Sequence, residues 1–139
     1  MASPPLTRRE YAYFAVTGLG DHSGITERLG IEPSQSWSEG DPRPSGGTYP
    51  CARWRFDSGL SDTEPLDKHI SALLDRLEAC PAAVRSLAAD YSGTIQCVGY
   101  YPASGHGVHI DLRLVQAAAH LGLQFDLDFY FLPEHGHDG

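Results

Sequence analysis

The sequence predicts an α+β fold: a four- to five-stranded antiparallel or mixed sheet with helices on one face. Its strand-like segments alternate apolar and polar residues, which indicates a sheet with one covered face and one open face. Leu-Gly-Ile at 29–31 and Leu-Gly-Leu at 121–123 each follow a strand, a loop and a helix. This repeated unit is compatible with a pseudo-symmetric, ferredoxin-like sheet, and the alternation of the strands favours such an α+β arrangement over a doubly wound fold.

Four strands are expected where bulky apolar side chains alternate with polar ones. The last, QFDLDFYF, alternates strictly, with its leucine and phenylalanines on one side and its glutamine, aspartates and tyrosine on the other. Because the fold needs a core, Phe125, Leu127 and Phe129 should be buried beneath the helices. The predicted strands cover residues 11–17, 52–57, 93–101 and 124–131.

Helical spacing of apolar residues separates these strands. The clearest helix carries leucines and an isoleucine from Leu66 to Leu77, with Thr63 as its expected cap and Pro65 in its first turn. Asp111 stands where the last helix needs an N-cap. The predicted helices cover residues 23–30, 66–77, 81–90 and 112–122.

At 139 residues the chain fits a single domain, 1–139, with one hydrophobic core. Residues 1–9 and 133–139 are expected to be flexible tails. The segment 33–50 is rich in Pro, Gly and Ser, which predicts a long surface loop that Trp37 anchors.

Composition narrows the classes of partner and the compartment. A formal net charge of -8 argues against nucleic acid. No segment is apolar enough for a signal peptide or a membrane span, so a cytoplasmic location without membrane contact is expected. The three cysteines form no CxxC pair, which predicts reduced thiols, with Cys97 buried in a strand.

Several segments together are similar to a known family. They are YAYFAVTG, ITERLGIEPSQSWSEGD, the tryptophan of RWRF, HISALLDRLE, VGY and LGLQFDLDFYF. They resemble a bacterial family called domain of unknown function 4279, over roughly residues 11–131, and LGIEPSQSWSEGD is the most specific part. The family has no established activity, so the resemblance implies a fold and no catalytic residue.

Histidine-rich stretches raise the question of a metal. GHGVHID places His106 and His109 near Asp111, without the i, i+4 or knuckle spacing that zinc ligands usually show. His22 is the remaining candidate for a third ligand, if the two loops meet at one end of the sheet. The second stretch, EHGHDG, lies in the glycine-rich tail. We expect neither a metal site nor a cofactor.

Catalytic patterns are equally weak, so an enzyme is the less favoured class and no catalytic residue is expected. Cys51 has no base tied to it by a local pattern. GLGDHSG resembles a phosphate-binding loop but lacks its lysine, and no GxSxG, HExxH or dinucleotide fingerprint is present.

The sheet face opposite the helices is the best candidate for a binding surface. Period-two geometry turns tyrosines, arginines and aspartates toward it, and tyrosine and arginine are enriched at binding hot spots. The alternative is a solvated face on which arginine and aspartate pair across strands. With Trp37 of the loop, the candidate binding residues are Tyr11, Tyr13, Trp37, Arg53, Arg55, Gln96, Tyr100, Asp126, Asp128 and Tyr130.

We therefore expect a non-catalytic binding or interaction module that acts through this face and the 33–50 segment. An immunity or antitoxin-like protein is one example, because opposite charges speed association with a basic toxin. The alternative is a small-molecule binding protein or enzyme, with 33–50 as a lid over an anionic ligand held by Arg53 and Arg55. Homodimerisation through the same face is a third possibility.

Overall fold

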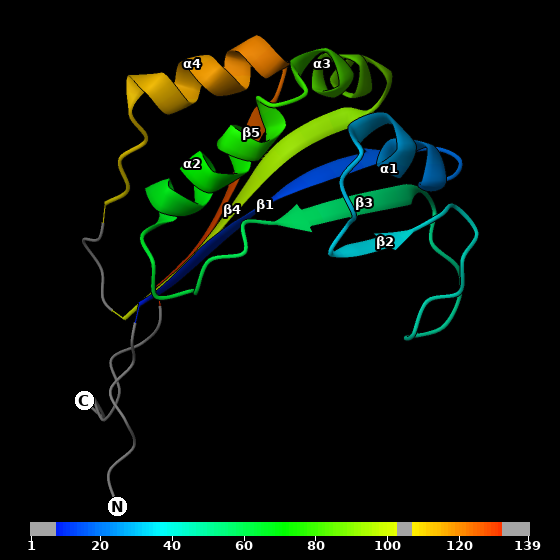
Figure 1. The fold of residues 1–139 in the computed structure, drawn as a ribbon. Helices are drawn as coiled ribbons and strands as arrows, with labels where there is room; N and C mark the ends of the chain where they lie inside the picture. The colour runs from blue at the N-terminus through cyan, green and yellow to red at the C-terminus, as the bar shows by residue number, and fades with distance from the viewer. Residues whose placement is uncertain (1–7, 103–106, 132–139) are drawn as a thin grey trace, which may run out of the picture.

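The computed structural model describes residues 8–102 and 107–131, which form a five-stranded mixed sheet with four helices on one face (Figure 1). The α+β prediction is confirmed. Along the chain the elements are β1 (Arg9–Gly18), α1 (Ser23–Leu29), β2 (Gln35–Trp37), β3 (Ala52–Asp57), α2 (Leu66–Leu77), α3 (Pro81–Asp90), β4 (Ser92–Tyr101), α4 (Leu112–Leu121) and β5 (Gln124–Phe131).

The strand order is β2-β3-β1-β4-β5. β1 lies antiparallel to β3 and β4, β2 lies antiparallel to β3, and β5 lies parallel to β4. The first four strands, with helices between β1 and β2 and between β3 and β4, have the split βαβ connectivity of ferredoxin-like folds. α4 and β5 extend this unit by one parallel crossover, which is why the sheet is mixed.

The Leu-Gly repeat marks two helix ends. Gly30 after α1 and Gly122 after α4 both adopt left-handed conformations, with φ of 68° and 77°, and close their helices as C-caps. The ferredoxin-like repeat instead relates β1–α1–β2 to β3–α2–α3–β4. The repeated Leu-Gly sequence therefore reflects the same type of helix C-cap at both places and does not mark the structural repeat.

The core lies between the helices and the inward side of the sheet. Phe14, Trp54 and Ile95 are fully buried there, and the Trp54 indole N–H donates to Thr26 Oγ1 at 2.9 Å, which satisfies its polar atom. Cys97 is buried as predicted, and burial raises the pKa of its thiol to about 12. All three cysteines are free thiols.

The inward side of β5 is less covered than its alternation predicts. Phe125 and Phe129 are half-buried and pack against the core, but Leu127 is 52% exposed and Phe131 is 53% exposed. Leu127 pairs with Cys97, so it does lie on the helix side of the sheet. It is exposed because β5 is the edge strand, and the prediction that it is buried is wrong.

Three local expectations also need correction. Arg9 begins β1 and Arg8 forms an ion pair with Glu10, so the folded body starts before residue 10. Pro65 occupies the N-cap position of α2 that was expected for Thr63. The 33–50 segment contains β2, whose three residues pair with β3. The residues after 131 lie outside the described structure.

None of the described helices combines the length and the apolar character needed to cross a membrane.

The cap predicted at Asp111 is present, because its Oδ1 accepts from the Leu114 N–H at 3.1 Å. Asp111→Ala should therefore lower the free energy of unfolding by about 0.5 to 2 kcal/mol. Urea unfolding measures the change. Asp75→Ala on the exposed side of α2 is the matched control, since it removes a carboxylate without a cap. Equal urea midpoints for the two variants would show that the cap contributes nothing.

Candidate functional site

We call the sheet face without helices the open face. The strand register places the predicted binding residues together on it, because paired residues point to the same side of a sheet. Tyr13 pairs with both Gln96 and Asp57, and Trp37 pairs with Arg53. The ten residues that share the face are Tyr11, Tyr13, Trp37, Arg53, Arg55, Gln96, Tyr100, Asp126, Asp128 and Tyr130.

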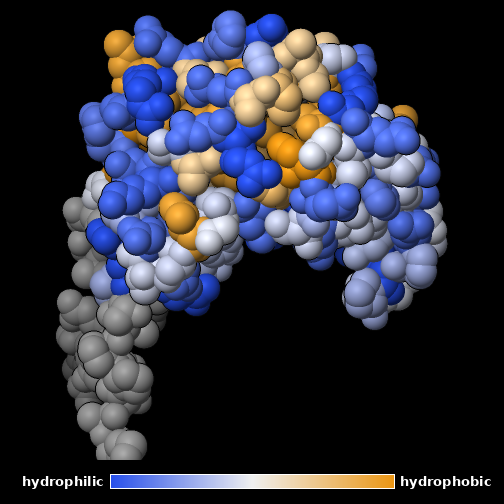
Figure 2. Space-filling model, viewed as in Figure 1, coloured by the Kyte–Doolittle hydropathy of each residue, from blue (hydrophilic) through white to orange (hydrophobic). Residues whose placement is uncertain are grey.

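The open face is concave and its centre is not solvated. Figure 2 shows the outline of the molecule hollowed below the sheet, between the 38–51 loop and the end where β1 begins. Tyr13, Ala15 and Val98 are 9%, 5% and 6% exposed and form a second, small hydrophobic cluster. Tyr11 and Tyr100 pack against it. The expectation of an exposed Tyr13 is therefore wrong: its ring is part of the floor of the face.

Arginine side chains lie over this aromatic floor. The Arg55 Cζ is 3.6 Å from the Tyr13 ring centroid. The Arg53 Cζ lies 5.8 Å from the Tyr13 ring and 5.9 Å from the Trp37 ring, and its Nη2 donates to the Tyr13 hydroxyl at 3.2 Å. Arginine stacked on aromatic rings loses mobility but keeps N–H donors at its edge. The two guanidinium groups are therefore held in place before any partner arrives.

The stack continues into the loop that follows β2. Trp37 and Tyr49 stack with ring centroids 4.1 Å apart and planes inclined by 13°. The Arg43 Cζ lies 5.6 Å from the Tyr49 centroid. Sequence reasoning missed Tyr49 and Arg43, because no periodicity links them to Trp37. The 33–50 segment thus adds an ordered aromatic wall to the open face.

Polar residues of the Ser-Glu-Gly-Asp (SEGD) sequence at 38–41 hold this wall in place. The Gly20 N–H donates to Glu39 Oε1 at 2.9 Å, and the His22 N–H donates to Ser38 Oγ at 3.2 Å. Asp41 accepts from the Ser38 N–H at 2.8 Å through Oδ2 and from the Tyr49 N–H at 2.9 Å through its carbonyl oxygen. The SEGD residues therefore have a structural role, which fixes Trp37 and Tyr49 relative to the sheet.

The β4–β5 side of the open face has the opposite charge. Asp126 and Asp128 are exposed there, and Gln96 Nε2 donates to Asp128 Oδ2 at 2.6 Å. Tyr100 and Tyr130 stack with centroids 4.9 Å apart. The open face is thus divided into a basic side on β3, an aromatic centre and an acidic side on β5.

A cavity of about 480 Å³ opens beside this face where β3 ends. Two ion pairs flank it: Arg9 Nε lies 3.1 Å from Asp62 Oδ2, and Arg55 Nε lies 2.7 Å from Asp57 Oδ1. The other residues that line it are Tyr11, Ala12, Ser58, Gly59 and Leu60. None of the lining residues comes from the 33–50 segment, so the expected lid does not cover this cavity.

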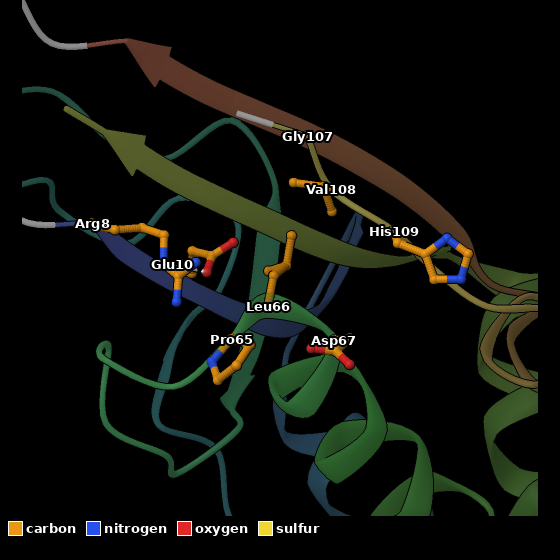
Figure 3. Close-up of a pocket in the computed structure, with 8 residues that line it drawn as sticks. All are labelled: Arg8, Glu10, Pro65, Leu66, Asp67, Gly107, Val108 and His109. Atoms are coloured by element: carbon orange, nitrogen blue, oxygen red, sulfur yellow. Dashed lines mark ion pairs between the residues drawn. The ribbon is translucent and has the colours of Figure 1, made fainter. Parts of the chain in front are cut away.

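His22 and His109, the two candidate loop histidines that the structure describes, do not converge on one site. His109 lines a smaller cavity of about 210 Å³ with Arg8 and Glu10, where β1 begins and α2 starts (Figure 3). His22 follows the opposite end of β1, and His106 lies outside the described residues. Within residues 8–102 and 107–131, no three His, Cys, Asp or Glu side chains are grouped to hold a metal ion.

The chain matches a known protein family. The profile of the family described as Domain of unknown function (DUF4279) matches residues 8–132, which is nearly the whole chain. The protein therefore belongs to this family. No curated protein and no solved structure matches the chain.

Proposed function

We propose that this protein is a non-catalytic binding module that holds another protein against its open face and the 33–50 segment, in the cytoplasm. The observation that carries the proposal is the stack of Arg55, Tyr13, Arg53, Trp37 and Tyr49 across a concave sheet face. Rigid aromatic and arginine side chains bind at low entropic cost, because little mobility is left to lose.

Among the described residues, Ser58 and His69 come closest to a catalytic pair, and their surroundings favour a binding module over an enzyme. Ser58 Oγ lies 2.6 Å from His69 Nδ1, a distance at which histidine can act as a base. However, His69 is fully buried and its Nε2 has no hydrogen-bond partner among the described residues. His69 therefore lacks the carboxylate partner that orients the histidine of a serine hydrolase, as far as the described residues show. The pair is better suited to joining the β3–α2 loop to α2.

A small anionic ligand in the cavity at the end of β3 is the second candidate. Its volume of about 480 Å³ is within the usual range for ligand sites, and it presents Arg9 and Arg55. Both arginines are already paired with aspartates, so an anion has to compete with Asp62 and Asp57. This competition favours the protein-binding proposal.

An immunity or antitoxin-like role fits the same surface. The chain carries a formal net charge of -8, and the acidic side of the open face adds a local negative field. A basic toxin would associate rapidly with such a protein by electrostatic steering. This part of the proposal is supported by charge alone.

Capture from cells with matched variants tests the proposal. Tagged wild-type protein is compared with Arg53→Ala/Arg55→Ala and with Arg85→Ala/Arg113→Ala. The second variant removes two exposed arginines from α3 and α4, so the charge change is equal but lies on the helix layer. We expect a protein partner that the wild type and the helix-layer variant retain and the open-face variant loses. If only the helix-layer variant loses the partner, the binding surface lies on the helix side of the sheet and the proposal is wrong.

A further inference from the structure

The outer edge of β5 offers a second type of binding. β5 pairs with β4 on one side, and no described strand pairs with its other side. It has eight residues and contains no Lys, Arg or Pro, and its only charged residues, Asp126 and Asp128, protect the edge mainly against a strand of like charge. The opposite edge of the sheet is β2, which has only three residues. Within the described sheet, β5 therefore presents the longer row of backbone groups available to an added strand.

The side chains of β5 give this edge two different faces. Asp126 and Asp128 are exposed on the open face and make no ion pair with any described residue. Leu127 and Phe131 are about half exposed on the helix side, at 52% and 53%. A strand laid against β5 places its own side chains alternately beside these two sets. The complementary strand therefore alternates basic residues with apolar ones.

A second copy of this chain is a poor occupant for the edge. When two β5 strands pair with each other, their aspartates face one another across the new interface, and like charges opposite each other are unfavourable. Each copy also carries a formal net charge of -8. Charge thus favours a basic partner over self-association.

We propose that β5 binds an extended segment of a partner protein by strand addition, with Lys or Arg residues of the segment facing Asp126 and Asp128 and apolar residues covering Leu127 and Phe131. Backbone hydrogen bonds along the edge supply affinity, and the alternating side chains supply specificity. The inference goes beyond the proposed function, because it uses the backbone edge of the sheet and does not need Arg53 or Arg55.

A short fluorescent peptide of alternating Lys and Val is the probe, with binding to the full chain followed by anisotropy at physiological salt, where distant charges are screened. We expect saturable binding, and added protection of the 124–131 amides in hydrogen exchange. Asp126→Asn/Asp128→Asn should weaken binding about tenfold or more, since these exposed substitutions keep shape and remove charge. Arg53→Ala/Arg55→Ala should bind the peptide like the wild type.

Two further peptides separate strand addition from simple attraction to an acidic protein. The same sequence with methylated backbone nitrogens keeps its charge but loses its donors, so it should not bind. A Lys-Ser peptide keeps charge and donors but loses the apolar side, so it should bind more weakly. Equal binding by the methylated peptide would overturn the proposal. So would a wild-type dimer that Leu127→Lys converts to monomer, because a second copy would then cover the edge.

Peptide binding that is lost in Arg53→Ala/Arg55→Ala but unchanged in Asp126→Asn/Asp128→Asn also contradicts strand addition at β5. It places the peptide on the basic side of the open face and leaves the proposed function intact. Conversely, normal peptide binding by the arginine variant, together with normal partner capture by that variant, contradicts the proposed function and leaves the β5 inference intact. The two proposals can therefore fail separately.

Discussion

Gly99→Ala should destabilise the protein by about 3 kcal/mol, at the upper end of the cost of overpacking a core. A Cβ at this position would lie 2.5 Å from Cζ of Tyr101 and closer still to its hydroxyl oxygen. Tyr101 is fully buried and cannot swing into solvent. Its hydroxyl also donates to Glu10 Oε2 at 2.9 Å, so moving the ring strains a hydrogen bond to a carboxylate that is only 4% exposed.

Urea unfolding measures the effect, and Gly24→Ala is the control. A Cβ on Gly24 meets no atom within 4 Å, and Gly24 lies inside α1. The same chemical change should there be neutral or stabilising by up to about 1 kcal/mol, because alanine favours helix. If both variants unfold at the wild-type midpoint, Tyr101 does not pack against Gly99 as closely as the structure shows.

Arg53→Ala/Arg55→Ala should weaken binding of the native partner by about tenfold or more, the loss expected when hot-spot side chains are removed. This variant should also lower the free energy of unfolding by more than a substitution of two fully exposed residues would. Both arginines are half-buried and stack on aromatic rings, so we expect a loss of about 1 to 2 kcal/mol where exposed substitutions cost about 0.5 kcal/mol. A domain of ordinary stability remains folded after such a loss.

Calorimetry with the purified partner, alongside thermal unfolding of each variant, separates the two effects. Arg85→Ala/Arg113→Ala should bind like the wild type, because its charge change lies on the helix layer. Arg53→Lys/Arg55→Lys should bind with intermediate affinity, since lysine keeps the charge but not the planar stacking. Normal binding by Arg53→Ala/Arg55→Ala would exclude the basic side of the open face as the binding surface.

Local patterns were sufficient for most elements of this fold. The strand at 52–57 and the helix at 81–90 begin and end where alternation and Pro81 predict. β2 could not be predicted, because its three residues lie in a segment rich in Pro, Gly and Ser and are held by pairing with β3. Pairing between distant segments leaves no period in the sequence.

The sequence was sufficient to predict which residues share the open face, but not how deeply each of them is buried. Period two identifies which residues share a face, and the register confirms that Tyr11, Arg53 and Asp126 do so. How deeply a residue is buried also depends on the order of the strands, and the alternation of apolar and polar residues does not reveal that order. Tyr13 is buried because β1 is central and Arg55 lies over its ring, whereas Leu127 is exposed because β5 is at the edge.

Hydroxyl-radical footprinting of the protein bound to its native partner tests most directly whether the open face is the working surface. Complexes are purified from cells that produce the tagged chain, and oxidation of single side chains is compared with the free protein. We expect protection of Trp37, Tyr100 and Tyr130 on the open face, and unchanged oxidation of Leu112 and Val115, which are 68% and 45% exposed on α4. Protection of Leu112 and Val115 with unchanged Trp37 and Tyr130 would contradict the account, because the partner would then lie on the helix layer.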